Sequence, residues 1–210
     1  MKNCVGKRAV LTVNLILVIL EMIALIHDIR AFGAEMFKWY TIDSNVLQLV
    51  VSVLVLYCCI KGRDISGTVT KLHFISAVGL SVTFLIAAFV LAPEGGIRYY
   101  FLDNVAPINH LLGPVLSVVS LLFLEKSGKQ SHWIIIYPAA ATLLYGLICL
   151  VLNAVGILDG PYFFLQVRVQ PAGVIILWLA IIAVLCIFLA GVYYKIKWKL
   201  SFRELCNGNP

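Results

Sequence analysis

A threonine and a histidine are the residues of this sequence best suited to covalent chemistry. Thr41 lies near the start of one long apolar stretch. His110 lies six residues beyond Asn104, where another stretch begins, which is ~9 Å inward at a helical rise of ~1.5 Å per residue. The two side chains are therefore expected at similar depth. A hydroxyl beside an imidazole is the minimum of a nucleophile and base pair, so this pair predicts acyl transfer or ester hydrolysis.

Further polar side chains lie within the apolar stretches, where they are costly unless they are paired or face a cavity. These candidates are Glu21, Asp43, Ser44, Asn45 and Asn109. Ser44, Asn45 and Asn109 are candidate donors to a developing oxyanion. Glu21 is expected either protonated and bonded to a neighbour, or charged beside a donor such as His110. The alternative interpretation is structural, with helix caps and hydrogen bonds between helices accounting for all of them.

Six apolar stretches must position these residues. The chain of 210 residues is 62% hydrophobic and 12% charged, and its mean hydropathy is +1.01, whereas soluble domains are about 25% charged. Each stretch is long enough to cross ~30 Å of hydrocarbon as a helix. The expected fold is a single all-α, polytopic membrane domain over residues 1–210, with spans at Ala9 to Asp28, Tyr40 to Ile60, Leu72 to Ala92, Val105 to Leu124, Trp133 to Asn153 and Ala172 to Tyr194.

The basic residues predict the orientation of this domain. Twelve Lys and Arg residues flank the spans on one side and four on the other. Because the more basic side faces the cytoplasm, both termini are expected there. The net charge of +6 is then a topology signal that favours contact with anionic lipid headgroups rather than with nucleic acid. Short loops and the lack of processing signals suit a bacterial cytoplasmic membrane.

Local features sharpen the expected site. Pro114 cannot donate a helical hydrogen bond to the carbonyl of His110, so a kink is expected there. The aromatic segment from Tyr162 to Leu165 is expected to dip over the rim as a lid or as a membrane anchor. The polar groups are expected to gather at the end of the bundle that contains Thr41 and His110. His73 is expected at the opposite membrane interface. No metal-binding, nucleotide-binding or flavin-binding motif is present in the sequence, so no cofactor is predicted.

Three groups of residues resemble one family. The segment from Phe37 to Asn45, which contains Tyr40-Thr41 and Ser44-Asn45, resembles the second helix of bacterial relatives of the androgen-induced and androgen-dependent integral membrane proteins. Leu102-Asp103-Asn104, with Asn109-His110 and Pro114, resembles its fourth-helix segment. Tyr137-Pro138 with Tyr145, and Tyr162 to Leu165, resemble its fifth helix and the following loop.

The resemblance implies a fold of six membrane helices and a hydrolase of fatty acid esters of hydroxy fatty acids, with Thr41 and His110 as the catalytic threonine and histidine. Two alternatives from other classes stay open. In a small transporter or channel, Glu21, Asp43 and His110 would form a proton or ion relay, although the expected lack of polar groups in the other half of the bundle argues against it. In a noncatalytic lipid-binding protein, the polar groups would only fix helix packing. The sequence does not predict the oligomeric state.

Overall fold

The computed structural model describes residues 2–200, with side chains from residue 6 to residue 198. It is all-helical over this range, and five helices are long and apolar enough to cross a membrane. The protein is therefore a multi-pass membrane protein. Its principal helices are α1 (Lys2–Phe32), α2 (Tyr40–Ile60), α3 (Gly67–Ile86), α6 (Gly113–Val119), α7 (Ile136–Ala154) and α8 (Ala172–Tyr194).

Shorter segments extend or connect these helices. They are η1 (Gly33–Lys38), η2 (Ala87–Leu91), α4 (Ala92–Gly95), α5 (Ile97–Phe101), η3 (Ile108–Leu112), η4 (Ser120–Leu124), η5 (His132–Ile135), η6 (Phe163–Leu165) and η7 (Lys195–Leu200). The segments η3, α6 and η4 together form a continuous apolar helix, Ile108–Leu124, which is shorter than the other five.

The predicted spans agree with the helices in position, and some of them differ in length. The predicted bounds 40–60 and 172–194 match α2 and α8. The predicted span 9–28 is too short, because α1 runs from Lys2 to Phe32. An apolar run marks only the part of a helix that contacts hydrocarbon, whereas the backbone hydrogen bonds continue into the polar flanks.

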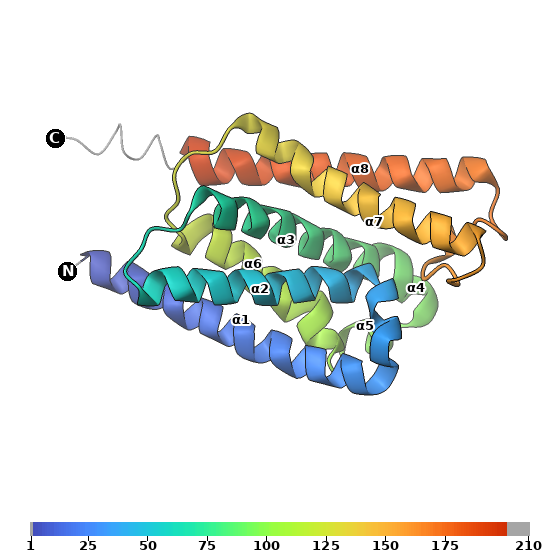
Figure 1. Ribbon diagram of the computed structural model, residues 1–210, viewed down its shortest axis with the longest axis horizontal. Coiled ribbons are helices and arrows are strands. Elements are labelled where there is room, and N and C mark those ends of the chain that lie inside the picture. Colours follow the sequence, from blue (N-terminus) through green and yellow to red (C-terminus); the bar gives the residue numbers. More distant parts are fainter. Residues whose placement is uncertain (1, 201–210) are drawn as a thin grey trace.

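Helix α3 is the centre of the bundle. It contacts α2, α6, α7 and α8, and Figure 1 shows it between the α1–α2 pair and the α7–α8 pair. Phe74, Ala77 and Val78 on this helix are fully buried and belong to the main apolar core. In contrast, α1, α7 and α8 expose large apolar side chains such as Ile23, Leu144 and Val184. This outward apolar surface is what lipid contact requires.

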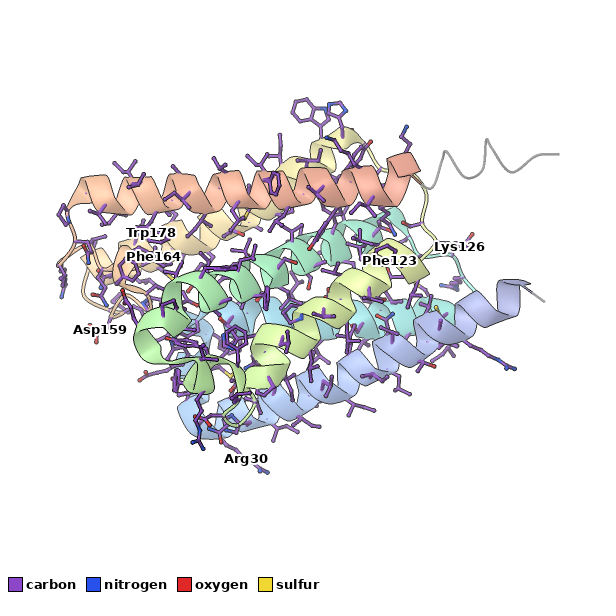
Figure 2. All side chains as sticks on the ribbon, turned by 180° about the vertical axis from the view of Figure 1, so that it is seen from behind. Arg30, Phe123, Lys126, Asp159, Phe164 and Trp178 are labelled. Carbon is purple, nitrogen blue, oxygen red and sulfur yellow. The ribbon has the colours of Figure 1, made fainter. Side chains whose placement is uncertain are left out.

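The bundle has two distinct ends. The first turns of α1 and the last turns of α8 lie at one end, which we call the terminal end (Figure 1). The opposite end, which we call the cavity end, carries α4, α5 and the segment that joins α7 to α8. In Figure 2, Arg30 and Asp159 mark the cavity end, and Phe123 and Lys126 mark the terminal end.

Candidate functional site

A cavity of about 440 Å³ opens at the cavity end of the bundle. Its wall is formed by the last turns of α1, the start of α2, the segment from Tyr99 to His110, and residues 161–163 of the loop after α7. Thr41 and His110 both line it. The two residues that the sequence selects for chemistry are thus brought to one cavity, although they are far apart in the chain.

Thr41 stands between a larger cavity with several polar groups and a smaller, more apolar pocket. It lies in the first turn of α2 and is half-buried. Besides the large cavity, it lines a second pocket of about 50 Å³ whose other walls include Val82, Ile86 and Leu179. The threonine hydroxyl can therefore meet a polar group from one side and an acyl chain from the other.

His110 lies in the middle of η3, a π-helical turn over Ile108–Leu112. The expected distortion before Pro114 takes this form, and Gly113 N–H donates to the Ile108 carbonyl. The imidazole packs edge-on against Tyr100 and Phe101, with ring centroids 5.9 Å and 6.0 Å away. Its Nδ1 is buried and has no hydrogen-bond partner within the described part of the chain.

No hydrogen bond joins Thr41 directly to His110 among the described residues. Proton transfer between them therefore needs a bridging water or a small rearrangement when substrate binds, which is common for catalytic groups in free enzymes. Glu21 does not pair with His110 either, because both of its carboxylate oxygens lack a hydrogen-bond partner.

The other candidates divide between the cavity and its support. Asn109 lines the cavity, whereas Ser44, Asn45, Asp43 and Glu21 do not. The Ser44 hydroxyl donates to the Thr41 carbonyl at 2.9 Å, and the Asn45 amide donates to the same carbonyl at 2.7 Å. The Asn109 amide donates to Asp28 at 3.2 Å. With their donors engaged in this way, these three side chains are placed to fix the backbone around Thr41 and His110.

The hydroxyl of Tyr162 is a further polar group at the site, and its role there was not predicted from the sequence. Its phenol interacts with the Thr41 side chain and with the backbone of Tyr40 and Thr41, and burial raises its pKa to about 12. The phenol is therefore protonated at neutral pH and can donate. The aromatic residues of this segment predicted that it lies over the end of the bundle. The contact of the Tyr162 hydroxyl with Thr41 could not be predicted, because it depends on the path of the loop backbone.

The loop that carries Tyr162 is held firmly over the cavity. Phe164 stacks on Trp178 of α8 with ring centroids 5.2 Å apart, and both lie at the cavity end in Figure 2. The Asn153 side chain donates to Leu158 and accepts from Val167, at 2.9 Å and 2.8 Å. Phe164 is buried, and the aromatic segment packs against α7 and α8 beside the cavity, whereas its function as a lid remains a prediction.

A second polar network occupies the terminal half of the bundle, which the sequence analysis expected to be apolar. His73 Nδ1 contacts Glu125 at 2.9 Å, and its Nε2 faces Gln48 and Ser117. His73 is fully buried rather than at the membrane interface. The network also includes Asn14, Ser52, Ser76, Ser120 and Lys197. Among the described residues, no hydrogen bond connects it to the groups around Asn45 and Asn109.

The comparisons leave the family open. No family model matches this chain, and neither a curated protein nor a solved structure matches it. Within the described residues, no group of three or more His, Cys, Asp or Glu side chains could hold a metal ion. The proposed function therefore rests on the geometry of the cavity.

Proposed function

We propose that this protein is an intramembrane hydrolase of lipid esters in which Thr41 is the nucleophile and His110 the base. The supporting observation is that both residues line one cavity while Thr41 also borders an apolar pocket. A fatty-acid ester fits a site with both kinds of surface, because its acyl chain binds to apolar side chains and its carbonyl must contact polar groups. By resemblance, esters of fatty acids with hydroxy fatty acids are the substrate class.

The proposed reaction has two steps. The Thr41 hydroxyl oxygen attacks the ester carbonyl carbon while His110 takes its proton, and Tyr162 donates to the oxyanion. Collapse of this intermediate breaks the bond to the leaving alcohol, which receives the proton from His110. Water then attacks the acyl-threonine, again with His110 as base, and the fatty acid and free Thr41 result.

The proposed topology has six crossings with both termini in the cytoplasm of a bacterial cell. The sixth crossing is Ile108–Leu124, whose length of roughly 25 Å is close to the thickness of hydrocarbon. An even number of crossings agrees with the position of the α1 start and the α8 end at one end of the bundle (Figure 1). The cavity would then open to the outer side, where water reaches it and membrane lipids can enter laterally.

The test is covalent labelling of the purified protein with a fluorophosphonate probe, followed by mass spectrometry. Thr41 should carry the adduct, Thr41→Ala and His110→Ala should each abolish labelling and ester hydrolysis, and Thr41→Ser should retain part of both. Thr68→Ala is the matched control, because Thr68 is an exposed threonine at the start of α3. Full labelling of a folded Thr41→Ala variant would disprove the assignment, and an unlabelled wild type would favour a noncatalytic lipid-binding protein.

A proton or ion relay is the second candidate, and the network around His73 and Glu125 favours it. The predicted lack of polar groups in the terminal half disfavoured a relay, but this half contains the buried network of His73, Glu125, Gln48 and Ser117. A relay predicts proton or ion flux across liposomes that depends on His73 and is indifferent to Thr41→Ala. A hydrolase predicts the reverse dependence.

A further inference from the structure

Buried oxygen atoms without donors gather next to the cavity, between α1, α2 and η3. Glu21 is only 2% exposed, yet neither carboxylate oxygen has a hydrogen-bond partner among the described residues. The side-chain oxygens of Asn45 and Asn109 are also buried and without partners. Leaving an ionised carboxylate buried and unpaired is strongly unfavourable. A positively charged or donating species is therefore required at this place.

The hydrogen bonds of the two amides fix the direction of these oxygens. The Asn45 nitrogen donates to the carbonyls of Thr41 and Asn109, at 2.7 Å and 3.2 Å. The Asn109 nitrogen donates to a carboxylate oxygen of Asp28 at 3.2 Å. Because carbonyls and carboxylates only accept, turning either amide over would place oxygen against oxygen. The unpaired amide oxygens are thus a property of the fold.

Three oxygens surround one point beside Gly113. A Cβ atom at Gly113 would lie 2.6 Å from Glu21 Oε1, 3.0 Å from Asn45 Oδ1 and 3.0 Å from the Ile108 carbonyl oxygen. A pocket of about 10 Å³ also lies against Glu21, Asn45 and Asn109. That space holds about one particle of the size of a water molecule. A side chain at Gly113 would occupy the point between the three oxygens.

We propose that Glu21, Asn45, Asn109 and the backbone of η3 bind a single monovalent cation, sodium by its size and charge. Carboxylate, amide and irregular helical carbonyl oxygens are the ligands that hold sodium inside membrane proteins. A proton on Glu21 would provide only one donor and would leave other oxygens unpaired. A water molecule would leave the charge of Glu21 uncompensated.

Charge balance favours a monovalent over a divalent ion. The two carboxylate oxygens of Asp28 are engaged by His27 Nδ1 at 3.2 Å and by the Asn109 amide. Asp28 also lines the small pocket, but Glu21 supplies the only buried carboxylate with both oxygens unpaired among the described residues. No Lys or Arg lines the small pocket. Calcium sites, in comparison, recruit six to eight oxygens and usually several carboxylates.

The test is the unfolding temperature of the purified protein in detergent, titrated with sodium chloride against choline chloride at constant ionic strength. Wild type should gain stability in a saturable manner, by roughly 5 °C at a sodium concentration about 100 times the Kd. Lithium and potassium test the selectivity by size. The measurement needs no substrate, so its result is independent of whether the protein hydrolyses esters.

Two variants remove the site in different ways. Glu21→Gln removes the charge while keeping the shape, and it should fold and lose the sodium response. Gly113→Ala fills the space and should weaken the response at least tenfold in sodium concentration. Glu94→Gln is the matched control, because Glu94 is exposed at the same end of the bundle, and it should respond like wild type. Equal stability of wild type in sodium and choline, or an unchanged sodium response in Glu21→Gln, would overturn the proposal.

Discussion

The proposed chemistry depends on the hydroxyl group of Thr41. The surroundings of Thr41 suit a nucleophile in a membrane protein. Ser44 and Asn45 donate to its backbone carbonyl, which fixes the first turn of α2 without occupying the side chain. His110 lies across the same cavity. Positioning by neighbours that do not react supplies much of the rate of such enzymes, because the reacting groups are held in place before substrate arrives.

The Tyr162→Phe variant should distinguish the contribution of the oxyanion donor to the rate from that of the nucleophile. Loss of this hydroxyl should lower kcat for ester hydrolysis by ~100-fold, with a much smaller change in KM, because an oxyanion donor acts mainly in the transition state. Because burial raises the pKa of Tyr162 to about 12, the wild-type rate should show no loss from ionisation of this phenol below about pH 11.

Tyr99→Phe is the control for that variant, since Tyr99 lines the same cavity and is exposed. Its kcat should remain within about twofold of wild type. Equal losses in the two variants would mean that the Tyr162 hydroxyl has no special role. Steady-state kinetics with a chromogenic fatty-acyl ester measures both variants.

The residue types and their expected depth in the membrane were sufficient to predict that Thr41 and His110 lie close to one site. The individual hydrogen bonds around them could not be predicted. The roles of Asn45 and Asn109 depend on which atoms their amides meet, and that is set by the approach of η3 to α2. Glu21 was expected to have a neighbouring donor, but the structure gives it none among the described residues. No motif signals the grouping of oxygens beside Gly113, because backbone and amide ligands leave no fixed spacing in a sequence.

At the scale of helices, hydrogen bonds between polar side chains connect different elements. Asn14, Glu21 and Asp28 are seven residues apart, which places them on one side of α1, and all three are buried. The network of His73 was not predicted, because its partners lie on different helices. Ser120 and Glu125 are close in sequence, but Asn14 and His73 reach them only after the bundle forms.

Glu125→Gln should destabilise the bundle in a manner that depends on pH. Burial alone would raise the pKa of Glu125, but the charge of His73 and hydrogen bonds from His73 and Ser120 outweigh it and lower the pKa. A lowered pKa means that the stabilisation is present above the usual carboxyl pKa of about 4.3 and is lost as the pH falls through the native value.

The loss in Glu125→Gln at neutral pH should be ~2 kcal/mol, or roughly 4–8 °C in unfolding temperature. The difference from wild type should shrink as the pH is lowered below 4. Glu35→Gln is the comparison, since Glu35 pairs with Lys38 at the surface, where solvent and salt screen the pair and its loss should change stability little. Thermal unfolding in detergent at several pH values measures all three proteins. A difference that stays constant with pH would contradict the proposed ionic role.

At the scale of the whole molecule, composition was enough to predict an all-helical membrane protein, and apolar runs located its helices. The predicted span 105–124 also coincides with the continuous helix Ile108–Leu124, which is shorter than the other five and contains the π-helical turns η3 and η4. The terminal end carries most of the described basic residues, including Arg8, Lys61 and Lys126, whereas Arg30 and Arg168 lie at the cavity end. The charge distribution thus agrees with the predicted orientation, which remains a prediction.

Cysteine labelling in intact cells tests this orientation. Asp159 is exposed at the cavity end (Figure 2), and Gly128 at the terminal end has room for a side chain, with no atom within 4 Å of a new Cβ. In a background with Cys4 and Cys206 replaced by Ser, Asp159→Cys should react with a membrane-impermeant maleimide and Gly128→Cys should react only after lysis. The four native cysteines within the range of described side chains are buried and should stay unlabelled. The opposite labelling pattern would place the cavity on the cytoplasmic side, and a lipid ester would then have to reach Thr41 from the inner leaflet.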